Sequence, residues 1–276
     1  MAAESHAAEP SVICVWRPRS KPQTAFIACP VFEIFFGGAR GSLKTDGVLG
    51  DWIRHSDLYG ENAIGLMVRR NSVQLQETIE RAKQIYTPLG FKFRESPQHI
   101  CRAPNGARLR FAYLERDSDA EEYQGHSYTR VYVEEIGNFP SQTPVMKLMA
   151  TLRSAAGVPC GFRATGNPGG PGQHWVKARY IDPAPGGWKV IKTDYKNPFD
   201  GSVVTRERVF IPGKITDHDL LGAAYIANLQ MSGSPELVRA WLEGDWTVVA
   251  GAFFPEFSLE RHVVKPFAIP EHWSRI

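Results

Sequence analysis

Several features are scarce or absent in this sequence of 276 residues. No run of about 18 apolar residues is present to span a bilayer, and the polar start lacks the apolar segment of a signal peptide. The formal net charge of +3 is too small to indicate nucleic-acid binding by itself. The scattered cysteines form no CxxC pair and have no histidine at metal-ligand spacing, which argues against a disulfide framework and a zinc site. These cysteines are Cys14, Cys29, Cys101 and Cys160. We therefore expect a soluble protein of a reducing, intracellular compartment.

What the sequence does contain is an alternation of strand-like and helical segments. Apolar runs rich in branched and aromatic residues predict strands, and apolar residues at helical spacing predict helices. The expected strands lie within 31–36, 63–69, a hairpin over 99–114 with an Asn105-Gly106 turn, 130–133, 161–170 and 187–195. The expected helices lie within 44–55, 72–90, 141–154 and 172–181. This alternation predicts an α/β fold with a mainly parallel sheet, helices on both faces, and functional groups at the carboxyl ends of the strands.

The last part of the sequence has a weaker pattern. Residues 199–214 are expected to form an irregular loop. Residues 218–246 predict two short helices, broken at 232–235 by serine, glycine and proline. The chain length suits one large α/β domain with such a small helical appendage.

A glycine-rich segment joins the first expected strand to the first expected helix. It matches the phosphate-binding pattern G-x-x-x-x-G-K-[ST], except that Leu43 replaces a glycine. Amides at a helix start favour anions, because they lack partners within the helix and lie at the positive end of its dipole. The expected ATP-binding residues are Gly38, Ala39, Arg40, Gly41, Ser42, Leu43, Lys44 and Thr45. Lys44 would reach the β- and γ-phosphates and Thr45 would offer its hydroxyl to Mg²⁺. The alternative is a glycine-rich turn that binds no nucleotide.

Leu43 affects this prediction in one of two ways. If the backbone there requires a positive φ, a residue other than glycine costs on the order of 1–2 kcal/mol, which a folded scaffold can absorb. If its side chain instead meets a phosphate, nucleotide binding is weakened. Because Lys44 and Thr45 are retained, we favour the tolerated case.

Two adjacent acids follow the strand-like run 130–133. Glu134 is expected to hold Mg²⁺ through its water shell, and Glu135 to orient or deprotonate the attacking water. Aspartate is commoner at the metal-side position, and the longer side chain of glutamate can change direct coordination to a water-bridged contact. Two acids after a strand can also mark the start of an ordinary loop, so their assignment depends on the phosphate loop upstream.

Three segments together resemble the large terminase subunit of tailed bacteriophages, the motor that packages DNA into a procapsid. They are GGARGSLKT at 37–45, VYVEEIGNFP at 131–140 and RATGNPGGPGQHWVKARY at 163–180, and the last is the most specific to that family. The resemblance extends from about Pro22 to Phe257. It implies a P-loop NTPase of the additional-strand, RecA- and terminase-like kind.

The resemblance also implies a domain organisation. It divides the chain into an N-terminal arm at 1–21, a P-loop ATPase domain at 22–195 and a linker or lid subdomain at 196–257. Residues 258–276 would begin a connection to a C-terminal nuclease domain of RNase H-like fold. Nuclease activity is not expected within this chain.

Site roles follow from the same resemblance. Residues 38–45 would be the Walker A loop, and Glu134 and Glu135 the Walker B pair. Thr165, Gly166 and Asn167 resemble the coupling motif that senses the γ-phosphate and transmits hydrolysis to DNA movement. Gln23 resembles the glutamine that reads adenine, and an ordinary surface glutamine is the alternative.

An arginine can neutralise the charge that develops in phosphoryl transfer. The candidates are Arg40 within the loop, Arg130 before the acids and Arg153 at the end of the following helix. The resemblance allows a neighbouring subunit of a ring to supply one of them. For each of these arginines a solvated or structural role is the alternative.

The leading hypothesis is an Mg²⁺-dependent ATPase that translocates double-stranded DNA during viral genome packaging. The implied partners are DNA, the small terminase subunit, the capsid portal and other copies of the chain in a ring, with a monomer expected in isolation. The implied location is the host cell cytoplasm, without a membrane. One rival is a DNA helicase or repair ATPase, and another is a catalytically silent P-loop scaffold for partner assembly.

Overall fold

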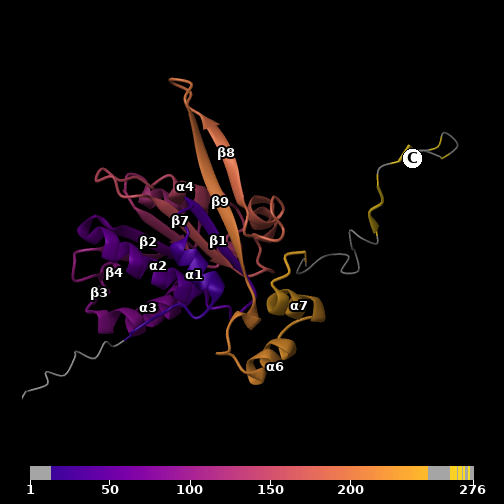
Figure 1. The fold of residues 1–276 in the computed structure, drawn as a ribbon, viewed down its shortest axis with the longest axis horizontal. Coiled ribbons are helices and arrows are strands. Elements are labelled where there is room, and N and C mark those ends of the chain that lie inside the picture. Colours follow the sequence, from indigo (N-terminus) through magenta and orange to yellow (C-terminus); the bar gives the residue numbers. More distant parts are fainter. Residues whose placement is uncertain (1–13, 248–261, 266, 269, 271–272, 274–276) are drawn as a thin grey trace, which may run out of the picture.

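The computed structural model describes residues 14–247, 262–265, 267–268, 270 and 273. Within these residues the strands form one nine-stranded sheet in the order β3-β4-β5-β2-β6-β7-β1-β9-β8 (Figure 1). The strands are β1 (Glu33–Gly38), β2 (Ile64–Arg69), β3 (Lys92–Arg94), β4 (His99–Arg102), β5 (Arg108–Tyr113), β6 (Arg130–Val133), β7 (Gly161–Gly166), β8 (Val190–Lys196) and β9 (Val203–Gly213). The pairings among β5, β2, β6, β7, β1 and β9 are parallel, whereas β3, β4 and β8 pair antiparallel at the two edges. The predicted α/β fold is confirmed.

Helices cover both faces of this sheet. The α-helices are α1 (Lys21–Ala28), α2 (Lys44–Tyr59), α3 (Ser72–Tyr86), α4 (Thr143–Met149), α5 (Gln173–Val176), α6 (Ala223–Met231) and α7 (Pro235–Glu243). Short 3₁₀ turns are η1 (Gly60–Asn62), η2 (Thr87–Leu89), η3 (Asp117–Tyr123), η4 (Ile136–Asn138) and η6 (Ile215–Asp217), and a π-helical turn, η5 (Lys177–Ile181), continues α5. In the part of the chain that the structure describes, no helix is long and apolar enough to cross a membrane.

The strand side chains alternate between two apolar cores. Phe36 of β1 packs with residues of α1, α2 and α3, including Phe26 and Trp52. Its neighbour Phe35 packs in the other core, with residues of α4 and α5 such as Leu148. This is the pattern of a sheet buried on both faces, which explains the near-continuous apolar runs of its central strands.

Most of the predicted elements are present. The helices of 44–55 and 72–90 are α2 and α3, and the hairpin around Asn105-Gly106 is formed by β4 and β5. Helix α1 was not predicted, although Ser20 caps it by accepting a hydrogen bond from the amide of Gln23. The proline in its first turn looks like a breaker in sequence but is well suited to that position.

The expectation of an irregular loop over 199–214 is wrong. Strand β9 is 11 residues long, and its inner half pairs in parallel with β1. Its outer half pairs only with β8, and the two strands project beyond the rest of the sheet as a hairpin (Figure 1). That outer half is exposed on both faces and carries charged residues, so it lacks the apolar pattern of a buried strand. The sheet therefore continues to Gly213, past the domain boundary expected at residue 195.

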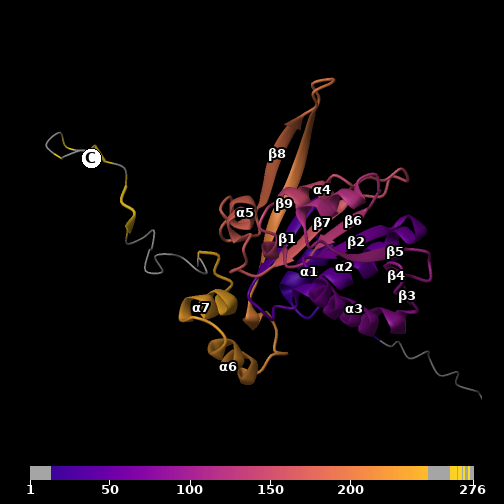
Figure 2. The same cartoon turned by 180° about the vertical axis from the view of Figure 1, so that it is seen from behind.

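The strand order brings the expected site residues to one edge of the sheet. Strand β7 lies between β1, which leads into the glycine-rich loop, and β6, which leads into Glu134 and Glu135. An extra strand in this place is the arrangement expected of an additional-strand P-loop fold. Helices α6 and α7 pack together beside the C-terminal end of β9, which is the end far from the hairpin tip (Figures 1 and 2).

A buried ionic cluster connects α2 to β6 and β7, toward the ends of these strands that lie opposite the expected site. The Asp51 carboxylate accepts a hydrogen bond of 2.7 Å from the Tyr132 hydroxyl. It also lies 3.4 Å from Nε of Arg130 and 3.7 Å from Nε of Arg163. All four residues are buried, so one carboxylate compensates two guanidinium groups that have little access to water.

We predict that Asp51→Asn lowers the free energy of unfolding by about 3 kcal/mol, because it leaves two buried cations without a counter-charge. Chemical denaturation measures this change. Asp46→Asn is the matched control on the same helix, since Asp46 pairs with the partly exposed Arg81 and should cost less than about 1 kcal/mol. Equal losses for the two variants would contradict this account of the cluster.

Candidate nucleotide-binding site

The first half of the glycine-rich loop is attached to the C-terminal part of the fold. The amide of Ala39 donates to the carbonyl of Gly213 at 2.8 Å, and the amide of Arg40 donates to the carbonyl of Trp241 at 2.8 Å. Gly38 has a φ of 137°, and a Cβ there would collide with the carbonyl oxygen of Gly213. This close approach requires glycine at position 38.

The second half of the loop leaves its donors open. Among the described residues, no protein acceptor pairs with the amides of Gly41, Ser42, Leu43, Lys44 and Thr45. These amides precede or open α2, a helix of 16 residues, so they combine unpaired donors with the positive end of a helix dipole. This segment has the chemistry of a phosphate-binding loop.

Leu43 adopts the left-handed conformation, with φ 58° and ψ 33°. The backbone therefore has a positive φ at this position, as in the first of the two cases considered for this residue. Gln23 supports this conformation, because its side-chain amide donates to the Leu43 carbonyl at 2.8 Å. Gln23 is fully buried, which excludes the surface alternative, and its Oε1 accepts from the amide of Arg19 at 2.6 Å. Whether Gln23 also reads adenine stays a prediction.

Lys44 and Glu135 are joined by the side chain of Asn167. Nζ of Lys44 donates to Oδ1 of Asn167 at 2.6 Å, and Nδ2 of Asn167 donates to both carboxylate oxygens of Glu135 at 2.8 and 2.9 Å. The Lys44 ammonium also donates to the carbonyl of Ala39 and the hydroxyl of Ser42. Burial lowers the pKa of Lys44 to about 8, although Glu135 and Glu134 act in the opposite direction.

The other residues of the expected coupling motif contact the acid-bearing segment and the strand that leads into the loop. The amide of Glu135 donates to the hydroxyl of Thr165 at 3.3 Å. Glu135 has a positive φ of 49°, a strained conformation of the kind that clusters at functional sites. Gly166 pairs with Gly37 immediately before the loop. The structure thus brings the three expected motifs, from β1, β6 and β7, to one place.

Glu134 is paired with an arginine that also lies near Thr45. Its carboxylate is fully buried, and Oε2 accepts from Nε of Arg69 at 3.0 Å and from the hydroxyl of Thr78 at 2.8 Å. Nη2 of the same arginine lies 3.5 Å from the hydroxyl of Thr45.

These residues fit a magnesium ion. Oε1 of Glu134 is buried and has no hydrogen-bond partner within the described part of the protein. A carboxylate and a hydroxyl, completed by phosphate oxygens and water, form the ligand set that Mg²⁺ prefers at nucleotide sites. Thr45 and Glu134 could therefore hold the ion, which would neutralise phosphate charge.

The three candidate arginines occupy different places. Arg40 is exposed, and its guanidinium lies 3.6 Å from the ring centroid of Trp241. It lines a pocket of about 370 Å³ together with Glu135 and Asn167. Arg130 lies at the opposite end of β6 in the buried ionic cluster, whereas Arg153 is exposed and donates to the carbonyl of Gly125. Neither Arg130 nor Arg153 reaches the loop of its own chain, because β6 separates them from it, so any role of theirs in hydrolysis would be on a neighbouring subunit.

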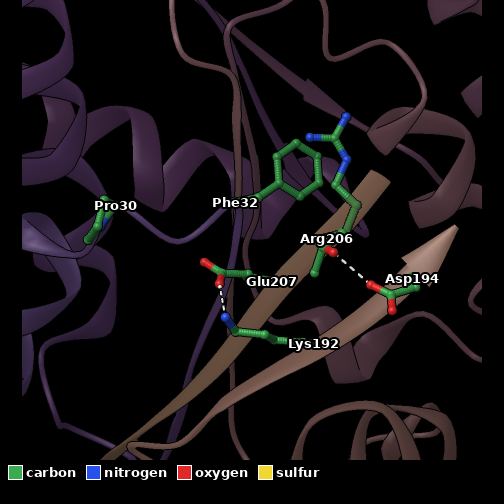
Figure 3. Close-up of a pocket in the computed structure, with 7 residues that line it drawn as sticks. Pro30, Phe32, Lys192, Asp194, Arg206 and Glu207 are labelled. Atoms are coloured by element: carbon green, nitrogen blue, oxygen red, sulfur yellow. Dashed lines mark hydrogen bonds and ion pairs between the residues drawn. The ribbon is translucent and has the colours of Figure 1, made fainter. Parts of the chain in front are cut away.

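A second hollow lies under the β8–β9 hairpin (Figure 3). Lys192 pairs with Glu207 at 3.2 Å, and the carboxylate of Asp194 accepts a hydrogen bond of 2.6 Å from the hydroxyl of Thr205. The remaining arginine, Arg206, stacks over the ring of Phe32. Each charged side chain that lines this hollow therefore already contacts a neighbouring residue.

Sequence reasoning did not identify Arg69 and Trp241, which also contact the site. Arg69 is the last residue of β2, and the strand register places it level with Glu134. The rule that functional groups gather at the carboxyl ends of parallel strands, applied to β2 as it was to β6, would have identified it. Trp241 has no comparable signal, because its place beside the loop depends on the packing of α7.

Comparison with known proteins identifies the family. A family model, described as the N-terminal part of the terminase large subunit, T4likevirus-type, matches residues 33–261. A search of curated proteins found no match.

Solved structures share the fold. The large terminase of a thermophilic bacteriophage, in complex with ADP, matches with a TM-score of 0.64 and 16% identity, over 92% of this chain and 60% of that chain. The same protein in complex with ATP-gamma-S gives a TM-score of 0.63 and 16% identity, over 92% of this chain and 59% of that chain. The large terminase ATPase domain of Thermus phage P74-26 matches with a TM-score of 0.53 and 11% identity, over 82% of this chain and 93% of that chain.

The chain thus spans about three-fifths of the thermophilic phage protein, and at these identities the likeness concerns the fold alone. The family match covers most of the chain and includes the loop, the two acids and the coupling segment. The chain belongs to the family of terminase large subunits, and the matched region is the N-terminal part of that subunit.

Proposed function

We propose that this chain is the ATP-hydrolysing motor domain of a viral terminase, which moves double-stranded DNA into a procapsid. The observation that carries the proposal is the meeting of the open loop amides, Lys44, Glu134, Glu135 and Asn167 at one edge of the sheet. Family membership supports an ATPase in a packaging motor, and related structures that hold ADP or ATP-gamma-S support nucleotide binding.

Each residue has a role in this proposal. The amides of Gly41 to Thr45 hold the phosphates, and Lys44 leaves Asn167 to neutralise the β- and γ-phosphates. Glu135 accepts a proton from the water that attacks the γ-phosphorus, the bond to the β-phosphate oxygen breaks, and ADP is the leaving group. Thr45 and Glu134 would hold Mg²⁺, which would neutralise phosphate charge. Arg40, which lines the same pocket as Glu135, stabilises the charge that develops on the transferred group.

The larger assembly is also part of the proposal. A ring of these chains would surround DNA, dock on the capsid portal and receive DNA from the small terminase subunit. Asn167 would couple hydrolysis to movement, because it contacts both the phosphate-binding lysine and the acid that activates water. The amides of Gly41 to Thr45, which are unpaired among the described residues, favour this function over a silent scaffold.

We expect Lys44→Ala to reduce ATP turnover at least about 100-fold, because the phosphates lose a buried positive charge. Phosphate release assays measure turnover, and circular dichroism checks that the fold persists. Lys147→Ala is the control, since Lys147 forms a surface pair with Glu121. A K44A variant with wild-type turnover would refute the site.

The pKa of Lys44 leads to a second prediction. Its ammonium has a pKa of about 8, below the ordinary 10.5, and bound phosphates stabilise the charged form. Nucleotide binding should therefore take up a proton above about pH 8, and affinity should fall as the pH rises further. Isothermal titration at about pH 9 in buffers of different ionisation enthalpy measures this uptake.

Lys44→Arg is the control for that titration, because arginine keeps its charge throughout this pH range. Proton uptake should be absent in this variant even if its affinity is lower. Equal proton uptake by the wild type and K44R would show that another group is responsible.

The motor function predicts translocation without unwinding. With ATP, the assembled protein should displace a third strand from a DNA triplex while leaving the underlying duplex paired. Separation of the duplex strands would instead indicate the rival helicase function. A scaffold would bind the ATP analogue weakly or not at all and would displace nothing.

A further inference from the structure

One guanidinium group occupies the space between the two proposed metal ligands. Arg69 donates through Nε to Oε2 of Glu134 at 3.0 Å, and its Nη2 lies 3.5 Å from the hydroxyl of Thr45. The position follows from the fold, because Val68 pairs with Val133 and the next residue of each strand is Arg69 or Glu134. A cation of the protein itself therefore lies where the proposed function places a divalent ion.

Burial makes this pairing necessary when no ligand is bound. The Glu134 carboxylate is fully buried, and a buried carboxylate without a counter-charge is costly. The side chain of Arg69 is only 11% exposed. Thr78 adds a hydrogen bond to Oε2, so one oxygen of Glu134 is saturated while Oε1 has no partner among the described residues.

The same arrangement opposes binding of a metal alone. Within the described residues, no group of three or more histidine, cysteine, aspartate or glutamate side chains could hold a metal ion. A divalent ion between Thr45 and Glu134 would thus have one carboxylate to bind and a buried guanidinium beside it to repel it. Only phosphate oxygens would supply the missing ligands and the extra negative charge.

We propose that Arg69 is an internal counter-cation that holds the place of the metal between Thr45 and Glu134, and that it yields this place when Mg²⁺ enters with ATP. The identity of the metal site rests on the proposed function. Arg69 lines the same pocket as Glu77, which provides a carboxylate for the displaced guanidinium. Arg69 thereby makes metal binding depend on nucleotide. It acts as a positioning residue for Glu134.

The test measures Mn²⁺ binding without nucleotide, from the loss of the electron paramagnetic resonance signal of free Mn²⁺. Arg69→Gln should bind Mn²⁺ at least about tenfold more tightly than the wild type, because the competing charge is gone. Adding Glu134→Gln to this variant should abolish the gain. Arg70→Gln is the matched control: it removes the adjacent positive charge, which pairs with Asp117 instead, and should behave as the wild type.

Two further measurements keep the proposal testable if the R69Q variant is unstable. Mn²⁺ should raise the melting temperature of R69Q, which lacks the counter-charge, far more than that of the wild type or R70Q. The wild type by itself should bind Mn²⁺ weakly without nucleotide and more tightly when an ATP analogue is present. Tight binding to the wild type without nucleotide, lost in E134Q, would overturn the proposal.

The outcomes separate this inference from the proposed function. If the wild type binds Mn²⁺ with the ATP analogue but R69Q shows no gain without it, the role of Arg69 is wrong and the ATPase assignment stands. If the wild type binds no Mn²⁺ even with the analogue, the proposed metal site is wrong, and the inference about Arg69 is wrong as well.

Discussion

The side chain of Asn167 makes the interaction on which the rest of the site depends. It accepts a hydrogen bond from the buried ammonium of Lys44 and donates to both carboxylate oxygens of Glu135. Burial disfavours the charged form of Lys44, so the ammonium needs these polar neighbours when no phosphate is present. Phosphates that attract Lys44 would break its hydrogen bond to Oδ1 of Asn167. The hydrogen bonds from Asn167 to Glu135 would then change as well. The phosphate-binding and water-activating groups are therefore not independent of each other.

The central part of this arrangement could be predicted from the sequence. Apolar runs ending in glycine, in Glu134 and in Thr165 to Asn167 indicate buried strands, and the carboxyl ends of parallel strands meet at one edge of a sheet. The resemblance to terminases rests on those same segments, and family membership is confirmed. Even the departure at Leu43 was interpretable, because a positive φ has a known and tolerable cost.

Other features depend on contacts that no local pattern encodes. Strand β9 has the sequence of a loop, because its outer half is a charged, two-sided ribbon and Pro212 lies near its end, yet its inner half pairs with β1. In the sequence, Arg69 is an ordinary charged residue at the end of a strand. Only the register with β6 shows that it lies level with Glu134. The stacking of Arg40 on Trp241 joins the loop to a helix far along the chain, at a separation over which the sequence carries no signal.

The most direct test of this account is a crystal structure with Mg²⁺ and a non-hydrolysable ATP analogue. We predict phosphate oxygens about 3 Å from the amides of Gly41 to Thr45, with Leu43 still left-handed and Lys44 moved from Asn167 to the phosphates. A nucleotide bound elsewhere on the molecule, or a loop that must leave this conformation to admit it, would contradict the account.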